Sequence, residues 1–91
     1  MKEVNSICNL LKELASQSDS RVAYTFLDDF GRQEQIISYK ELHEKATHVA
    51  TRLSKEAQVG DRIALLLPAS LEYIIAFFGC LYAGMVAVPL Y

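Results

Sequence analysis

The chain has 91 residues, of which 52% are hydrophobic and 22% are charged, with 9 Lys and Arg against 11 Asp and Glu. This composition excludes a disordered or low-complexity chain, and the net charge of −2 provides no basic face that could follow a nucleic-acid backbone. The two cysteines lack disulfide-like spacing, so we expect a reducing, cytoplasmic environment. The length allows one domain or part of one.

Residues 73–91 raise the question of a membrane segment, because this run contains no charged residue. A spanning helix needs about 20 apolar residues. Gly84 and Pro89 interrupt the run, however, and neither Lys nor Arg flanks it as an anchor. The N-terminus also lacks the apolar region of a signal peptide. We therefore expect buried structure in a soluble protein, with a small membrane-inserted protein as an alternative.

The N-terminal third predicts a helix followed by a β-hairpin. Apolar residues recur at spacings of three and four over residues 6–17, which predicts an amphipathic helix capped by Asn5 or Ser6. Residues 22–27 are rich in aromatic and β-branched side chains and predict a strand. Residues 28–32 contain Gly31 and predict a turn, after which residues 34–37 predict the returning strand.

A capping box marks the start of the next helix. The Ser38 hydroxyl is expected to accept from the backbone of Glu41, and the Glu41 carboxylate is expected to reach back to Ser38. The helix should cover residues 39–57 and end before Gly60. Its apolar stripe consists of Leu42, Ala46, Val49, Ala50 and Leu53.

The C-terminal third predicts a right-handed βαβ crossover. Residues 62–67 show no polar alternation, which is typical of a strand covered on both faces, and Pro68 ends it. Residues 85–88 predict a second buried strand, parallel to the first. The predicted fold class is α/β, with a β-hairpin and this crossover flanked by helices.

The helix inside the crossover is expected over residues 71–83, with Ser70 as its N-cap. Apart from Glu72 it is apolar on every side, so we expect it to be buried all round. Gly84 stands where a left-handed C-terminal cap belongs.

None of the usual chemical motifs is complete in this sequence. The glycines Gly31, Gly60, Gly79 and Gly84 are scattered and no Gly-Lys-Ser occurs, so no phosphate loop is predicted. We therefore expect no catalytic, cofactor-binding or metal-binding residue in these 91 positions.

Several single residues favour ordinary structural roles. His43 and His48 are turned about 140° apart on one helix, which suits solvated or capping histidines better than zinc ligands. Cys8 and Cys80 are interpreted as small buried hydrophobes. Other residues with structural interpretations are Asp28 and Asp29 as turn formers, Ser70 as a cap, and Tyr73, Phe77, Phe78 and Tyr82 as an aromatic core stripe.

Four stretches resemble a known superfamily. Residues 37–42, Ile-Ser-Tyr-Lys-Glu-Leu, are similar to a conserved stretch near the start of adenylate-forming enzymes, which include acyl-CoA synthetases, peptide-synthetase adenylation domains and luciferases. Residues 59–64 resemble their Gly-Asp-Arg-Val strand entry, and residues 81–89 their Ala-Gly-x-x-x-Val-Pro turn. Residues 76–91 are most similar to fatty acyl-AMP ligases.

The resemblance implies that residues 1–91 are the N-terminal portion of a large AMP-binding domain, ending before the phosphate loop and the C-terminal lid domain. The parent enzyme would use ATP and Mg²⁺ to convert a fatty acid to acyl-AMP, and would pass the acyl group to a carrier-protein thiol in lipopeptide or polyketide synthesis. The implied partners are the remainder of the domain, an acyl carrier protein and a fatty acid. The chain alone is expected to be inactive.

The residues themselves leave another class of protein open. A small non-enzymatic α/β module could use its apolar helix to pair with a partner chain. In either case the isolated chain is expected to self-associate, because an exposed apolar helix and unpaired strand edges tend to bind a second copy.

Overall fold

The computed structural model describes residues 2–17, 21–27, 33–66 and 70–90. Its elements, in chain order, are α1 (Lys2–Gln17), β1 (Val22–Leu27), β2 (Gln33–Ser38), α2 (Tyr39–Glu56), β3 (Arg62–Leu65), α3 (Leu71–Tyr82) and β4 (Val86–Pro89). The predicted mixed α/β fold is confirmed.

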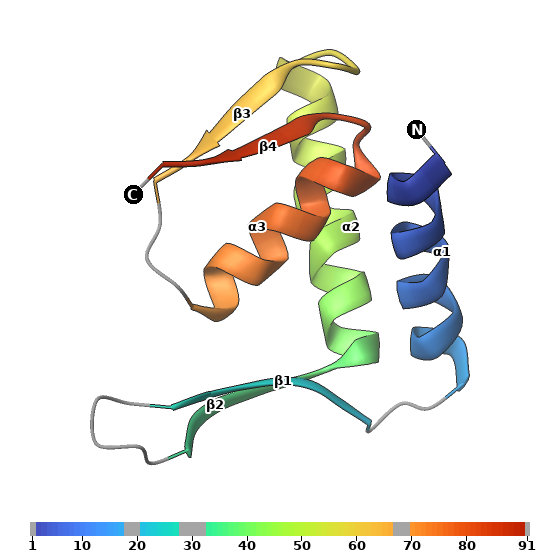
Figure 1. Ribbon diagram of the computed structural model, residues 1–91, viewed down its shortest axis with the longest axis vertical. Helices are drawn as coiled ribbons and strands as arrows, with labels where there is room; N and C mark the ends of the chain where they lie inside the picture. Colours follow the sequence, from blue (N-terminus) through green and yellow to red (C-terminus); the bar gives the residue numbers. More distant parts are fainter. Residues whose placement is uncertain (1, 18–20, 28–32, 67–69, 91) are drawn as a thin grey trace.

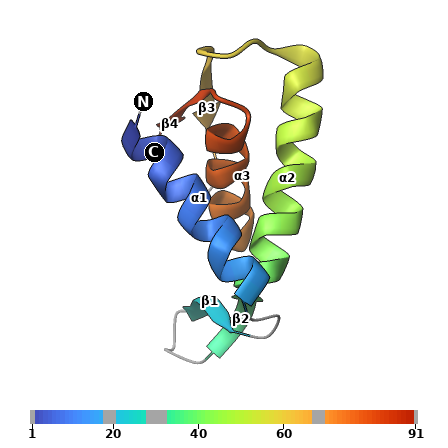
Figure 2. The same ribbon diagram turned by 90° about the vertical axis from the view of Figure 1, so that its right-hand side faces the viewer.

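The three helices lie side by side, with the β1–β2 hairpin beneath them at one end (Figures 1 and 2). The β3–β4 pair lies at the opposite end of the molecule, beside α3. The fold therefore has a hairpin end, formed by β1, β2 and the adjoining turns of α1 and α2, and a crossover end, formed by β3, α3 and β4.

Helix α1 is longer than the sequence pattern predicted. It begins at Lys2, so Asn5 and Ser6 lie inside the helix and the prediction that one of them caps it is wrong. The apolar spacing over residues 6–17 identifies only the part of the helix with a buried face. The helical hydrogen bonds of the backbone extend one turn further toward the N-terminus, where the residues are mostly polar.

The hairpin is confirmed as an antiparallel pair. Val22 pairs with Ser38 at one end and Leu27 pairs with Gln33 at the other, with two register irregularities between them. The backbone N–H of Tyr39 donates to the carbonyl of Arg21 at 3.0 Å, which ties the start of β1 to the start of α2. The predicted turn at residues 28–32 lies outside the described residues.

The capping box of α2 is present with both of its bonds. The Glu41 backbone N–H donates to the Ser38 hydroxyl at 3.1 Å, and the Ser38 backbone N–H donates to the Glu41 carboxylate at 3.5 Å. The helix ends at Glu56, and Ala57 is its extended C-terminal cap. A local sequence signal thus fixes where α2 begins and the angle at which it leaves the hairpin.

The hairpin end contains a buried hydrophobic cluster. Leu11 of α1, Ile37 of β2 and Leu42 of α2 form one buried cluster. The side chains packed against this cluster come from β1, α2 and α3 and are only partly buried: Ala23, Tyr39, Leu71, Ile74, Ile75, Phe78 and Tyr82.

A glycine allows α2 and α3 to approach closely. A Cβ atom at Gly79 would lie 2.5 Å from Val49 Cγ1 and 3.4 Å from the carbonyl oxygen of Ala46. Gly79 fits in α3 because the Val49 side chain of α2 leaves no room for a Cβ atom, and the cost of glycine in helix propensity is offset by this helix packing.

The crossover end has the predicted parallel strand pair, with α3 between the strands in the chain. Arg62 of β3 pairs with Val86 of β4, and Leu65 pairs with Pro89. The prediction that β3 is covered on both faces is wrong for this chain, because Arg62 and Ala64 are exposed while Leu65 is buried. A two-stranded sheet packed against one helix covers only one of its faces.

Helix α3 begins where predicted but is not buried all round. The Tyr73 backbone N–H donates to the Ser70 hydroxyl at 3.1 Å, which confirms the N-cap. Within α3 only Gly79 and Cys80 are fully buried, and the other apolar side chains of the helix remain partly exposed. Among the described elements, α3 packs mainly against α2, and it also contacts α1, β2 and the β3–β4 pair, which together do not enclose an apolar helix.

Gly84 confirms the predicted left-handed cap, with φ of 75°. The N–H of Gly84 donates to the carbonyl of Leu81, and the N–H of Met85 donates to that of Cys80. Gly60, with φ of 92°, turns the chain after α2, and its N–H donates to the carbonyl of Gly84 at 2.8 Å. These two glycines therefore bring the start of β3 beside the start of β4.

The three described helices contain no segment that is both long and apolar enough to cross a bilayer.

Candidate functional site

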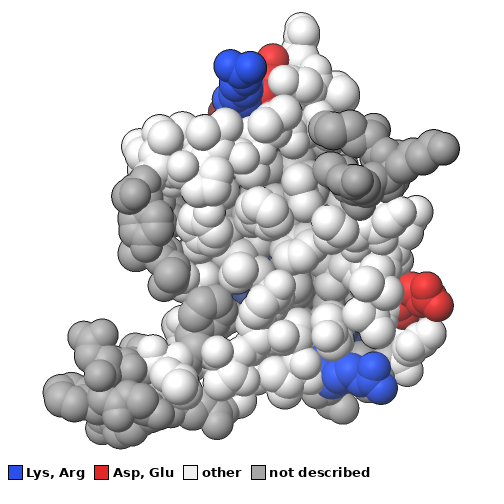
Figure 3. Space-filling model, viewed as in Figure 1, with Lys and Arg blue, Asp and Glu red and all other residues white. Residues whose placement is uncertain are grey.

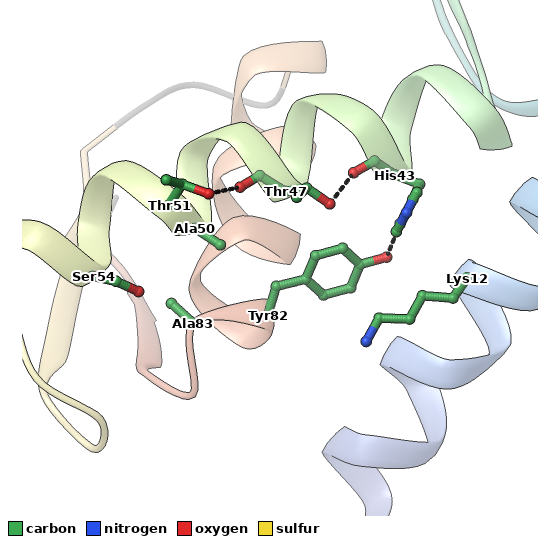
Figure 4. Close-up of a pocket in the computed structure, with 8 residues that line it drawn as sticks. All are labelled: Lys12, His43, Thr47, Ala50, Thr51, Ser54, Tyr82 and Ala83. Atoms are coloured by element: carbon green, nitrogen blue, oxygen red, sulfur yellow. Dashed lines mark hydrogen bonds between the residues drawn. The ribbon is translucent and has the colours of Figure 1, made fainter.

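The strongest candidate site is a polar pocket of about 350 Å³ between α1, α2 and the end of α3. Figure 4 shows Lys12 reaching toward Tyr82 from α1, and His43, Thr47, Thr51 and Ser54 arranged along α2. We call this group the polar pocket; its lining is Lys12, His43, Thr47, Ala50, Thr51, Ser54, Tyr82 and Ala83.

A histidine–tyrosine pair joins α2 to α3 at one side of the polar pocket. His43 Nδ1 lies 3.0 Å from the hydroxyl of Tyr82, and the two rings meet edge to face with centroids 5.6 Å apart. Burial, with a smaller contribution from Cys8, raises the pKa of Tyr82 from its usual 10 to about 12. The phenol therefore keeps its proton at neutral pH and can act as a hydrogen-bond donor.

Lys12 places the positive charge of the polar pocket over the same tyrosine. Its Nζ atom lies 5.4 Å from the centroid of the Tyr82 ring, within the range of a cation–π contact. This contact and the His43 bond make Tyr82 the residue at which all three helices meet.

The two threonines of the polar pocket use their hydroxyl protons within α2. Thr47 donates to the carbonyl of His43 at 2.8 Å, and Thr51 donates to the carbonyl of Thr47 at 3.0 Å. Their oxygen atoms remain available only as acceptors.

The polar pocket lacks the pairing that nucleophilic catalysis needs. A reactive Ser or Cys must lie within hydrogen-bond reach of a base, and here His43 is bonded to a phenol whose pKa is raised. Both cysteines are buried, and burial raises the pKa of each thiol, against a smaller opposing contribution from Lys12 at Cys8. Cys8 and Cys80 thus behave as the buried hydrophobes that the sequence predicted.

The histidines differ from each other. His48 is exposed on α2, as predicted, but His43 is half-buried and bonded to Tyr82, so its interpretation as a solvated or capping residue is wrong. Its partner is 39 positions away in the chain, and no local pattern could have revealed the pair. In the described parts of the chain, no three His, Cys, Asp or Glu side chains are grouped to hold a metal ion.

The remaining predicted positions have structural roles or lie outside the structure. Ser70 is an N-cap, as expected. Tyr73 and Phe77 are partly buried, while Phe78 and Tyr82 pack against the core cluster, so the aromatic stripe contributes to packing. Asp28 and Asp29 lie outside the described residues.

The two turns with left-handed glycines do not form a phosphate cradle. A phosphate cradle needs several free backbone N–H groups that converge on one point. The glycines with positive φ, Gly60 and Gly84, already donate their N–H groups to backbone carbonyls of this chain. These N–H groups therefore hold the turns of this chain together and are not free to bind an anion.

A second hollow, of about 170 Å³, lies between α1, the hairpin and α3. Ile7 and Leu10 are about half exposed along it. We call it the apolar groove; its lining is Ile7, Leu10, Leu11, Leu14, Tyr24, Tyr39, Leu42 and Phe78.

A hairpin leads through a capping box into a long helix and is followed by a parallel βαβ unit, which together define a mixed α/β architecture. Residues 11–91 match the family of AMP-binding enzymes, and the chain belongs to that family.

Several relatives that match most of the chain are fatty acyl ligases. The medium-chain-fatty-acid–[acyl-carrier-protein] ligase JamA of Moorena producens is 42% identical over 87 residues, which cover 96% of this chain and 15% of the relative. The long-chain-fatty-acid–AMP ligase FadD26 of Mycobacterium marinum is 42% identical over 88 residues, which cover 93% of this chain and 15% of the relative. The resemblance to fatty acyl-AMP ligases is thus confirmed.

The fold comparison extends over the whole chain. The fatty acid AMP ligase of Legionella pneumophila superposes with a TM-score of 0.86 at 35% identity, covering 100% of this chain and 16% of that one. The N-terminal subdomain of NpsA from Klebsiella oxytoca superposes with a TM-score of 0.78 at 27% identity, and the match covers 92% of this chain and 21% of that one. The chain spans about 15% of the length of the curated relatives that it matches.

Proposed function

We propose that residues 1–91 are the N-terminal portion of the large domain of a fatty acyl-AMP ligase, and that they serve as scaffold for a site built elsewhere in that enzyme. The observation that carries this proposal is the superposition of the whole chain on the Legionella fatty acid AMP ligase at 35% identity. The remainder of the enzyme would supply the phosphate loop and the C-terminal catalytic lysine.

The whole enzyme would activate a fatty acid. Its carboxylate would attack the α-phosphorus of ATP, with Mg²⁺ accompanying the nucleotide, to give acyl-AMP and pyrophosphate. A carrier-protein thiol would then take the acyl group and release AMP. The printed name of the JamA relative, an acyl-carrier-protein ligase, supports this acceptor.

The surface of the chain supports a scaffold role. Charged side chains are scarce on the face that presents α1, α3 and the β3–β4 pair (Figure 3), although 20 of the 91 residues are charged. Ile7 and Leu10 of α1 and Val86 of β4 are also exposed, and exposed apolar side chains that gather on one face are typical of a contact with another protein layer. We expect the remainder of the large domain to pack against this face.

A segment exchange tests the proposal. The matching segment of the Legionella enzyme is replaced by residues 1–91, and acyl-AMP formation is measured by fatty-acid-dependent pyrophosphate exchange. We expect the chimera to retain activity within about tenfold of the parent, because the two segments share one backbone. A second chimera carrying Gly84→Val should give less soluble protein with unchanged fatty-acid preference.

One result would contradict the proposal directly: a soluble chimera that melts cooperatively and yet forms no acyl-AMP. The isolated chain provides the complementary test, since we expect no heat of ATP binding in the presence of Mg²⁺ by isothermal titration. Micromolar binding that depends on Mg²⁺ would show that these residues hold nucleotide themselves.

A further inference from the structure

The β3–β4 pair at the crossover end has two outer edges, and these edges are not equivalent. In a parallel pair, alternate residues of each strand bond to the partner strand, and the residues between them point their N–H and C=O groups outward. No third strand of the described chain lies beside β3 or β4. Unpaired N–H and C=O groups on such an edge can bind a further strand.

Two hydrogen bonds show which residues of the pair face inward. The N–H of Val86 donates to the carbonyl of Asp61 at 2.8 Å, and the N–H of Leu90 donates to the carbonyl of Leu65 at 3.2 Å. The even-numbered residues of β4 and the odd-numbered residues of β3 therefore bond to each other. The odd-numbered residues of β4 and the even-numbered residues of β3 face outward.

The outer edge of β4 is poorly suited to bind another strand. Its outward residues are Ala87 and Pro89. Proline has no N–H, so Ala87 supplies the single outward donor of this four-residue strand. Natural sheets carry proline on edge strands, where it discourages further pairing.

The outer edge of β3 is not blocked in this way. Arg62 and Ala64 face outward, and each has both an N–H and a C=O group. No other described segment bonds to these groups. Arg62 is the one charged residue of β3 and stands at its first position, and Leu66, directly after the strand, is 74% exposed. An added strand would therefore gain backbone hydrogen bonds and also cover apolar surface.

We propose that a β-strand from the remainder of the fatty acyl-AMP ligase domain pairs with the outer edge of β3, and that the sheet is not extended at β4. This inference rests on the proposed function, because the added strand belongs to the same enzyme. The Legionella enzyme is long enough to supply such a strand, since this chain covers 16% of it. A second copy is a poorer occupant, because pairing two four-residue strands buries far less than the roughly 1,200 Å² of a stable complex.

Amide hydrogen exchange of the isolated chain, followed by NMR, tests whether the edge is open. We expect slow exchange at Ile63 and Leu65, which bond to β4, and fast exchange at Arg62 and Ala64. Protection of Ala64 equal to that of Ile63 would overturn the proposal. If that protection is lost on dilution, a second copy occupies the edge instead.

A matched pair of substitutions in the Legionella chimera tests which edge is extended. Ala64→Pro and Ala87→Pro each remove one outward N–H and impose the same backbone restriction on a strand. We expect Ala64→Pro to lower the midpoint of thermal unfolding by about 5 °C more than Ala87→Pro does. Loss of soluble protein with Ala64→Pro alone would support the proposal equally.

Equal midpoints for the two variants, or a larger loss with Ala87→Pro, would overturn the extension at β3. The midpoints do not depend on activity. A folded chimera that forms no acyl-AMP therefore contradicts the proposed function, while the comparison of the two proline variants still decides which edge is paired.

Discussion

The hairpin end and the crossover end contain similar kinds of side chain but differ in how completely they are enclosed. At the hairpin end, Leu11, Ile37 and Leu42 come from three elements and close a core with almost no exposed surface. At the crossover end, α3 is more apolar than α2 but buries fully only Gly79 and Cys80. The length of apolar sequence therefore does not decide burial; the number of elements that surround it does.

The two ends also differ in whether the described residues provide their packing partners. The capping box of α2 and its one-sided apolar stripe match the partners that this chain provides. The all-round apolar surface of α3 and the open edges of a two-stranded parallel sheet require partners that the described residues do not provide. The crossover end is thus the side at which we expect the remainder of the domain to pack.

The largest expected effect is self-association of the isolated chain. Leaving about 400 Å² of apolar surface uncovered forgoes about 10 kcal/mol, which is comparable to the stability of a small domain. Light scattering should report a dimer or larger species, and a hydrophobic dye should bind. Val86→Lys on β4 should reduce both signals, whereas His48→Lys on the exposed face of α2 should not. A clean monomer without dye binding would show that the crossover end closes by itself.

The next effect concerns the closed core of the hairpin end. Leu42 is 1% exposed, so Leu42→Ala should lower the free energy of unfolding by about 2–5 kcal/mol through lost burial and a residual cavity. Urea unfolding at low protein concentration measures it. The matched control is Leu10→Ala, at a position that is 56% exposed, which should cost under about 1 kcal/mol. Similar costs at both positions would contradict the difference in enclosure.

The two left-handed glycines provide a test within the crossover end. Gly84→Val should destabilise by about 1–3 kcal/mol, because a β-branched residue is strained at φ of 75° and its Cβ would lie 3.2 Å from Val59 Cγ1. Gly60→Val meets the same kind of strain at φ of 92° with no atom within 4 Å, so it should cost less. Thermal unfolding of the two variants isolates the contact with Val59. A Gly84→Val variant as stable as the parent would contradict the cap.

The smallest effect is the pH dependence that Tyr82 confers where the two ends meet. Its pKa is raised from 10 to about 12, so the folded state holds this proton more tightly than the unfolded state. The resulting stabilisation is complete below pH 10 and is lost as the pH rises through about 12. Because the phenol is partly solvated, we expect a loss of about 1 kcal/mol rather than the full value of the shift.

Tyr82→Phe should flatten this alkaline loss and, by removing the bond to His43, lower stability at neutral pH by about 0.5–1.5 kcal/mol. Chemical unfolding between pH 9 and 12 measures both effects. Tyr73→Phe, on the same helix, is the control and should retain the alkaline loss. An unchanged pH profile in Tyr82→Phe would show that another group causes it; the buried thiols of Cys8 and Cys80, whose pKa values are also raised, are the candidates.

The sequence by itself determined the features that short-range chemistry controls. Ser38 bonds to Glu41 and Ser70 to Tyr73, each three positions along the chain, and Gly84 turns the chain directly after α3, so these three caps could be predicted from the sequence. Composition likewise located β1, and the resemblance of residues 37–42 and 81–89 to adenylate-forming enzymes identified the family.

The tertiary structure alone decided what long-range packing controls. The His43–Tyr82 bond joins positions 39 residues apart, and the tight contact of Gly79 with Val49 depends on how α2 and α3 cross. Whether an apolar side chain is buried also depends on neighbours from other elements. The sequence could show that α3 is apolar on every side, but it could not show that the elements around α3 leave it partly exposed. Caps and turns depend on residues that are close together in the sequence, whereas burial depends on how all the helices and strands pack together.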